Sequence, residues 1–319
     1  MCTPTRATIR SMPKAGSVFA SVRLLNAAMA DVRKGAGDQR PLLLCGRSAP
    51  LDALIEALGA EGSPAAQLFA VRRLNRTDAA RLSEASVAVY GGEVLSGLDD
   101  QTRTDLEAVG RASSRKLVML EALDLPSDAI TAAGRVRGIE PRDVLSYRQG
   151  HFPVERAMDM LADRVGPSGP WVAAQLPALR SRIVEGVIET AARRNAKAAL
   201  LIFIPGADMP VLTAVQMRMV LQIAACHGEA ISADRALELL SVLGAAFGFR
   251  LLAREALDFI PVAGWAVQSG IAYSATRAVG MTADEYFARG AVADVSKVRA
   301  IAEGLRYEIE EQIRKRRAS

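Results

Sequence analysis

The stretch that decides the fold is LLLCGRSAPLDALIEAL, residues 42–58, where a short apolar run stands directly before a helical pattern. The apolar run at residues 41–45 is too short for a helix and stops at Gly46, which favours a buried strand. After it, leucine and isoleucine recur every three or four positions, so residues 50–60 predict a helix. A strand, a tight turn and a helix in this order are typical of an α/β fold.

The same alternation continues outward from this unit to residue 166. Further short apolar runs lie at residues 68–71, 86–90, 116–120 and 144–146. Helical patterns lie between them, over residues 77–82, 99–113, 127–135 and 153–165. Short apolar strands that alternate with amphipathic helices predict a parallel, doubly wound α/β sheet. In such a sheet a ligand binds at the carboxyl ends of the strands.

The turn after the first strand is where a phosphate-binding loop of the form G-x-x-x-x-G-K-[ST] would lie. Residues 46–53 read GRSAPLDA. Gly46 fits the motif, but Leu51 takes the place of the second glycine and Asp52 the place of the lysine. Pro50 also removes a backbone N–H. A carboxylate about 4 Å from a phosphate repels it by several kcal/mol at intermediate dielectric, where the lysine would attract it. We therefore interpret this turn either as a nucleotide site that no longer binds phosphate, with Gly46 and Asp52 as vestigial positions, or as one that never bound it.

Residues 38–166 also resemble a small GTPase domain of the Era-like class. The resemblance rests on element order and on PLLLCGR…LIEAL (41–58), SEASVAVYGG (83–92) and RKLVMLEALDLPSDAI (115–130). In that class an Asn-Lys-x-Asp motif follows a strand and its Asp binds guanine, whereas residues 121–124 read EALD here, so only Asp124 matches. The Asp-x-x-Gly motif of the class has no counterpart between residues 68 and 86. The resemblance implies a degenerate GTPase-like domain, with Asp124 either a vestige of its site or a turn residue.

From residue 171 onward the pattern is helical. Gly and Pro dominate residues 166–170, which indicates a linker or turn before a second, all-α domain. Helices are predicted over residues 171–203, 210–227, 232–247, 250–259 and 261–279. The windows 239–249 and 259–276 are apolar and rich in small residues. They predict either helices buried in a bundle or a hairpin in lipid.

This half resembles the domain of unknown function 697 family, a helical module found with Era-like GTPases in bacteria. The matching stretches are IPGADMPVLTAVQMRMVLQIAACHG (204–228), GFRLLAREALDFIPVAGWAVQSGIAYSATRAVG (248–280) and EYFARG (285–290). The resemblance implies a partner GTPase or association with a membrane. It marks four candidate structural or interaction positions: Asp208, Gln216, Arg250 and Pro261.

The ends of the chain are basic. No acidic residue precedes Asp31, and we expect a leader that runs into a helix over residues 18–32. Residues 295–313 carry an apolar stripe at helical spacing and are followed by RKRR (314–317). Such cations suit a helix C-terminus or anionic lipid headgroups. The predicted organisation is a leader and helix (1–37), an α/β domain (38–166) and a helical domain (171–319).

Composition restricts the chemistry. The net charge of +5 over 319 residues is too small to indicate a nucleic-acid partner. The three cysteines have no CxxC spacing, which predicts a reducing compartment, here the cytoplasm, and no structural zinc. His151 and His227 are the only histidines, and Cys226 and His227, adjacent on one helix, point about 100° apart. We expect no catalytic residue, no metal and no cofactor.

These patterns predict a non-catalytic, GTPase-like interaction or regulatory protein. Its expected partners are a protein, such as a GTPase, and the inner face of a membrane. Two alternatives stay open. A divergent GTPase predicts magnesium-dependent hydrolysis that requires Arg47 and Asp124, and an integral membrane protein predicts a helical hairpin that resists carbonate extraction. The partner's identity and the oligomeric state do not follow from the sequence.

Overall fold

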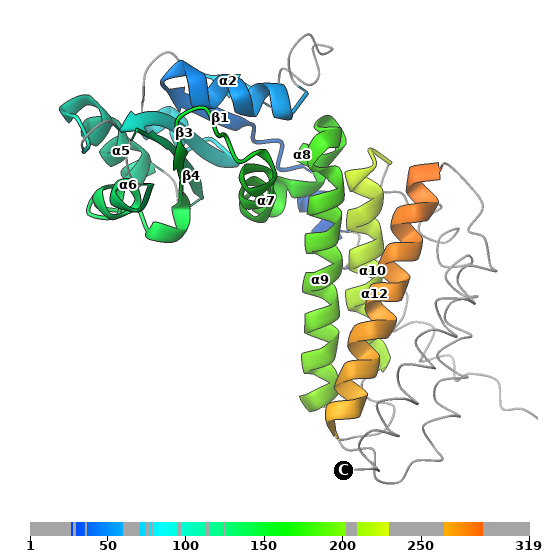
Figure 1. Cartoon of the computed structure of the whole chain (residues 1–319). Helices are drawn as coiled ribbons and strands as arrows, with labels where there is room; N and C mark the ends of the chain where they lie inside the picture. The colour runs from blue at the N-terminus through cyan, green and yellow to red at the C-terminus, as the bar shows by residue number, and fades with distance from the viewer. Residues whose placement is uncertain are drawn as a thin grey trace, which may run out of the picture.

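The structure is a computed structural model that describes residues 27, 30–35, 37–59, 71–74, 77, 79–94, 97–112, 115–123, 126–201, 209–229 and 265–289. An α/β part built on a five-stranded sheet is joined to a bundle of long helices (Figure 1). The strands are β1 (Leu42–Gly46), β2 (Val71–Arg73), β3 (Val87–Val94), β4 (Lys116–Ala122) and β5 (Val144–Arg148).

All strand pairs in the sheet are parallel, and the strand order is β2-β1-β3-β4-β5. β1 lies inside the sheet, with Leu42 in register with Val71 of β2 and with Val87 of β3. A strand covered on both faces needs apolar side chains on both, which the LLLC run of β1 supplies. The prediction of a parallel α/β sheet is confirmed.

Helices cover both faces of the sheet. The face that carries Leu42 and Leu44 packs against α2 (Ser48–Ala57) and α7 (Val154–Arg164). The opposite face, which carries Leu43, packs against three further helices. They are α4 (Ala79–Leu82), α5 (Asp100–Ala112) and α6 (Pro126–Ala133). The arrangement is the doubly wound one, in which each parallel crossover carries its helix onto one face.

β2 differs from the strand predicted at residues 68–71. The strand begins at Val71, and residues 68–70 lie outside the described residues. Arg72 and Arg73 are exposed because β2 is the edge strand, where charged side chains reach solvent. A search for apolar runs finds buried strands and misplaces a short edge strand of this kind.

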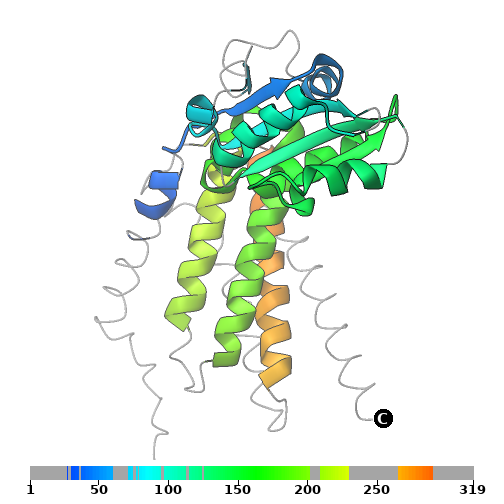
Figure 2. The same ribbon diagram turned by 90° about the vertical axis from the view of Figure 1, so that its left-hand side faces the viewer.

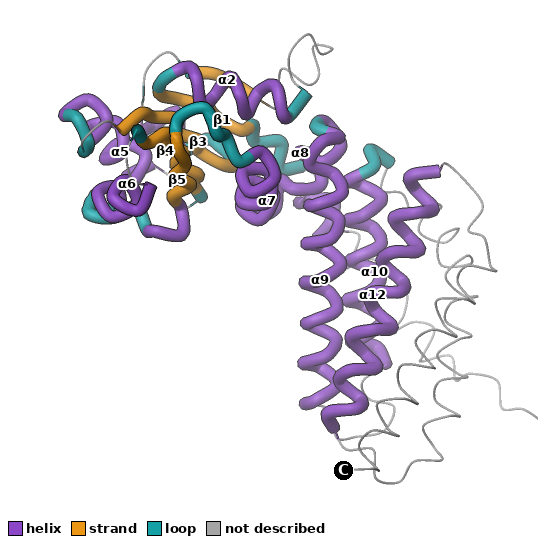
Figure 3. The backbone as a smooth tube through the Cα atoms, viewed as in Figure 1, coloured by secondary structure: helices purple, strands orange, loops and turns teal. Residues whose placement is uncertain are grey.

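Three long helices lie side by side in the bundle, α9 (Pro177–Leu201), α10 (Met209–Cys226) and α12 (Trp265–Arg289) (Figures 2 and 3). The helix predicted over 261–279 is observed from Trp265 and continues to Arg289. The helices predicted at 232–247 and 250–259 lie outside the described residues.

The segment between the two parts is folded. Residues Gly166–Ser168 form a 3-10 turn and lead into α8 (Gly169–Gln175), and Ser168 and Pro170 are buried. The single helix predicted over 171–203 is divided into α8 and α9. The division falls at Pro177, which has no N–H to donate and disfavours helical backbone in the residue before it.

One hydrophobic core extends from the α2 and α7 face of the sheet into the bundle. It joins side chains of the sheet, of α7 and of the bundle helices, among them Leu117, Leu161, Val172, Ile188 and Ile223. On the surface, Arg182 of α9 donates to Asp159 of α7 over 2.8 Å. The α/β part and the bundle therefore bury apolar surface against each other.

A polar layer crosses the bundle core. The Thr276 hydroxyl accepts hydrogen bonds from Asn195 Nδ2 at 2.8 Å and Gln216 Nε2 at 3.2 Å, and donates to the Ala272 carbonyl at 2.7 Å. All three side chains of the layer are buried, on α9, α10 and α12. The layer therefore aligns the three helices at one height, because each amide reaches the hydroxyl only in that register.

Thr276→Val is expected to lower the free energy of unfolding by about 1–2 kcal/mol, because two buried amides lose their common acceptor. Thr282→Val on the same helix is the matched control, since among the described residues the Thr282 hydroxyl bonds only to the Ala278 carbonyl of its own helix. We expect the control to stay within about 0.5 kcal/mol of the original protein. Urea unfolding measures both. Equal loss in the two variants would contradict the role of the layer.

None of the described helices is both long enough and apolar enough to cross a membrane. Of the predicted hairpin, residues 265–276 form the first half of α12, which packs against α9 and α10, and residues 239–264 lie outside the described ones. At the N-terminus, residues 30–35 are helical, and Asp31 forms an ion pair with Arg218 of α10. The amphipathic helix predicted at 295–313 also lies outside the described residues.

Candidate functional site at the carboxyl edge of the sheet

The strand order defines where a ligand of this sheet would bind. From β1 the chain moves to β2 on one side, and the next strand, β3, lies on the other side of β1. In doubly wound sheets the crevice beyond the carboxyl ends of two such strands is the binding position. Here it lies between Gly46, at the end of β1, and Gly91 to Glu93 on β3.

Gly46 lies in this crevice, in close contact with the backbone of β3. Its φ is +106°, and a Cβ at this position would be 2.1 Å from the Gly91 carbonyl oxygen. The next residue, Arg47, donates its backbone N–H to the same carbonyl at 2.8 Å. Glycine is therefore required by the close approach of two backbones, and an amide that a phosphate loop would offer to its ligand is already bonded.

The turn after β1 is too short to surround a phosphate. β1 ends at Gly46 and α2 begins at Ser48, so Arg47 alone connects them. Leu51, at the position of the second motif glycine, is fully buried over β3, and a Cβ on Gly91 would be 2.8 Å from Leu51 Cγ. The space in which backbone amides would surround a phosphate is occupied by an apolar side chain.

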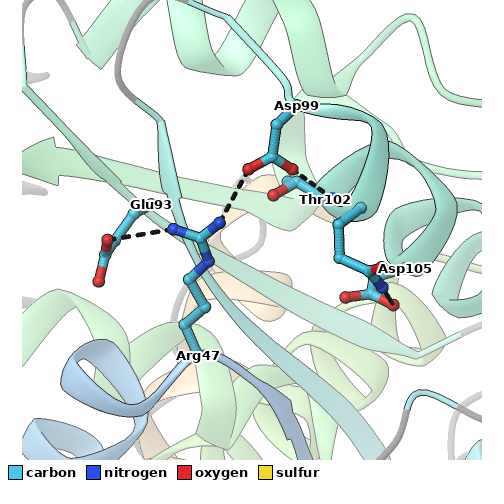
Figure 4. Close-up of polar contacts among 6 residues, drawn as sticks. Arg47, Glu93, Asp99, Thr102 and Asp105 are labelled. Atoms are coloured by element: carbon cyan, nitrogen blue, oxygen red, sulfur yellow. Dashed lines mark hydrogen bonds and ion pairs between the residues drawn. The ribbon is translucent and has the colours of Figure 1, made fainter.

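Arg47 lies across the edge and forms ion pairs with two carboxylates from different elements (Figure 4). Its guanidinium donates to Glu93 on β3 at 3.3 Å and to Asp99, just before α5, at 2.8 Å. All three side chains are substantially exposed, so each pair contributes only about 0.2–1 kcal/mol. Two carboxylates therefore share the guanidinium of Arg47.

Asp99 also caps α5. Its Oδ1 accepts the backbone N–H of Thr102 at 2.6 Å, an N-cap hydrogen bond. The bonds from Thr102 lower the pKa of Asp99, and the charge of Arg47 lowers it further. Asp99 therefore stays ionised at neutral pH and adds negative charge beside the crevice.

The candidate site residues predicted from the sequence do not lie together in the described part of the structure. Gly46 lies in the crevice, whereas Asp52 lies one turn into α2 and pairs with Arg73 of β2 at 2.7 Å. Gln216 belongs to the polar layer of the bundle. The other four positions lie outside the described residues: Asp124, Asp208, Arg250 and Pro261.

Sequence reasoning missed Glu93 and Asp99. Asp99 stands three residues before Thr102 at the start of a helical pattern, which is the spacing of an N-cap and could have predicted its capping role. Its pairing with Arg47, however, joins residues 52 apart, and no local pattern reports such a contact.

The other reactive side chains are engaged structurally. Burial raises the pKa of Cys45 and of Cys226 to about 12, so both thiols are protonated and poor nucleophiles. His227 Nε2 lies 2.8 Å from Asp284 Oδ1, and its ring stacks on Phe287, which ties α10 to α12. Within the described ranges, no group of three His, Cys, Asp or Glu side chains is arranged to hold a metal ion.

No family model, curated protein or solved structure matches this chain.

Proposed function

We propose that this chain is a non-catalytic, GTPase-like interaction protein whose α/β part is a docking scaffold without nucleotide. The observation that supports the proposal is the state of the crevice between β1 and β3. Leu51 fills it, and Arg47 is held by Glu93 and Asp99 at its rim. The helical part is proposed to contact a partner GTPase or the inner face of a membrane, with the chain in the cytoplasm.

Steric and electrostatic effects both disfavour a phosphate in this crevice. A phosphate in the crevice would have to displace Leu51 from a fully buried position, which costs about 1.5–3 kcal/mol for a leucine side chain. It would also lie beside two carboxylates and one arginine. Each carboxylate at about 4 Å repels a phosphate charge by roughly 1–4 kcal/mol between bulk-water and protein-surface dielectric. The single guanidinium does not outweigh both terms.

A fluorescent GTP analogue tests this proposal. In the presence of magnesium, we expect no saturable binding below about 1 mM, which corresponds to a binding free energy weaker than roughly −4 kcal/mol. Arg47→Ala should leave the titration unchanged. Saturable micromolar binding that is lost in Arg47→Ala and in Asp124→Ala would contradict the proposal and favour a divergent GTPase.

Flotation of the full chain with liposomes tests the second half of the proposal. Vesicles with and without phosphatidylserine distinguish an electrostatic surface contact from insertion, because only the former is released by salt. Resistance to carbonate extraction would instead favour an integral hairpin.

A further inference from the structure

The amino edge of the sheet, opposite the crevice, carries a group of cations. Arg111 lies in the last turn of α5, Lys116 is the first residue of β4, and Arg135 and Arg137 lie in the turn after α6. We call Arg111, Arg135 and Arg137 the amino-edge surface, and Lys116 is buried next to it. Helices of a parallel α/β unit run antiparallel to its strands, so the ends of α5 and α6 reach the edge where β4 begins.

Two glycines bring these elements into contact. A Cβ on Gly110 of α5 would be 2.3 Å from the Arg137 carbonyl oxygen, and one on Gly138 would be 2.5 Å from the Gly110 carbonyl oxygen. The backbone of the last turn of α5 therefore touches the backbone of the turn after α6. Arg111 and Arg137, each next to one of these glycines, therefore have their backbones close together at this junction.

Lys116 bonds to both of the backbones that meet at this contact. Its ammonium group donates to the Gly138 carbonyl at 2.7 Å and to the Gly110 carbonyl at 3.3 Å, and the residue is 5% exposed. Carbonyl groups accept hydrogen bonds but do not neutralise the charge. Burial lowers the pKa of Lys116, and the nearby charges of Asp143 and Glu140 act in the opposite direction.

Three carboxylates near this surface each have an arginine within ion-pair distance. Glu140 pairs with Arg142 at 2.8 Å, and Asp143 lies 3.9 Å from Arg164. Arg111 has Glu107 at 3.9 Å, across one turn of its own helix. Arg135 and Arg137 are exposed and form no ion pair with a carboxylate in the part of the chain that the structure describes. Glu107, Glu140 and Asp143 are thus each paired with an arginine, and the two unpaired arginines give the amino-edge surface its positive charge among the described residues.

We propose that the amino-edge surface docks an acidic segment of a protein partner. This inference rests on the proposed scaffold function and names the chemistry of its partner. Guanidinium groups bind carboxylates in bidentate geometry and are favoured where an anion must be recognised by shape. A protein segment is favoured over a single-stranded nucleic acid because the segment that carries this surface, residues 91–146, contains no aromatic residue on which bases would stack.

The test is binding of a fluorescein-labelled, glutamate-rich peptide to the full chain at low salt, measured by anisotropy. We expect saturable binding that is absent for the glutamine counterpart of the peptide. Arg135→Glu with Arg137→Glu should weaken it by about tenfold or more, since each reversal replaces an attraction with a repulsion. The matched control is Arg148→Glu with Arg156→Glu, which changes the net charge equally at exposed positions at the end of β5 and in α7. We expect the control to bind like the original protein.

Three outcomes would overturn the inference. Equal weakening in both double variants would show that only net charge matters, and no effect in either would show that these arginines merely balance the helix C-termini. Tighter binding of single-stranded DNA or of phosphatidylserine vesicles, lost in the Arg135 and Arg137 variant, would assign the surface to another class of partner. Circular dichroism of both variants checks the fold. The nucleotide titration is independent of all three, so failure of the scaffold proposal is recognised separately.

Discussion

Gly46→Ala is expected to destabilise the protein by at least about 3 kcal/mol, because the substitution combines backbone strain with a collision that nothing nearby can relieve. At φ +106° an L-residue is strained, and its Cβ would lie 2.1 Å from a carbonyl oxygen of the neighbouring strand. The obstacle is backbone inside the sheet. Relief would require β1 to move from β3 or the bond from Arg47 to Gly91 to break.

The matched control is Gly97→Ala. Gly97 also has a positive φ, +138°, but within the described ranges no atom lies within 4 Å of the position of its Cβ. The control therefore carries the strain without the collision and should lose about 1–2 kcal/mol. Comparing the urea unfolding midpoints of the two variants separates the cost of backbone strain from the cost of the collision. Equal losses of stability in the two variants would contradict the close backbone contact between β1 and β3 at Gly46.

Gly280→Leu is expected to destabilise the bundle by about 3 kcal/mol, at the upper end of the cost of overpacking a core. Gly280 is buried on α12, and a Cβ there would be 2.6 Å from Cγ1 of Ile188 and 3.1 Å from two further atoms of the same side chain. The absence of a side chain at this position lets α9 and α12 approach. A leucine would force the two helices apart or push Ile188 from its rotamer.

Gly270→Leu on the same helix is the control, since Gly270 is exposed and no atom of the described residues lies within 4 Å of its Cβ position. There the substitution should be neutral or gain up to about 1 kcal/mol from helix propensity. Thermal unfolding followed by circular dichroism compares the two. A destabilisation of similar size in both variants would show that the α9–α12 contact does not depend on Gly280.

The fold class could be predicted from the sequence wherever the pattern lies in neighbouring residues. The continuous apolar runs around Leu43 and Val118 predicted buried parallel strands, and the structure places both inside the sheet. β2 was misplaced because its Arg72 and Arg73 look like loop residues, and only pairing with β1 makes them a strand. The division at Pro177 was missed although the proline signal was present, because the helical pattern continued on both sides.

Only part of the candidate site could be predicted from the sequence. Gly46 and the substitutions at Leu51 and Asp52 predicted that a phosphate motif is broken. How it is broken depends on contacts over long sequence separations: Leu51 against Gly91, and Arg47 against Asp99. Spacing in the sequence cannot report such contacts. Similarly, the turn composition at residues 166–170 suggested a linker, but the burial of that segment depends on packing with the bundle.

The most direct test of the central claim is a crystal structure of the full chain grown with a non-hydrolysable GTP analogue and magnesium. We expect Leu51 packed over Gly91, Arg47 paired with Glu93 and Asp99, and no nucleotide density between β1 and β3. Density for the analogue beside Gly46, with Leu51 displaced and Arg47 turned onto a phosphate, would contradict the account.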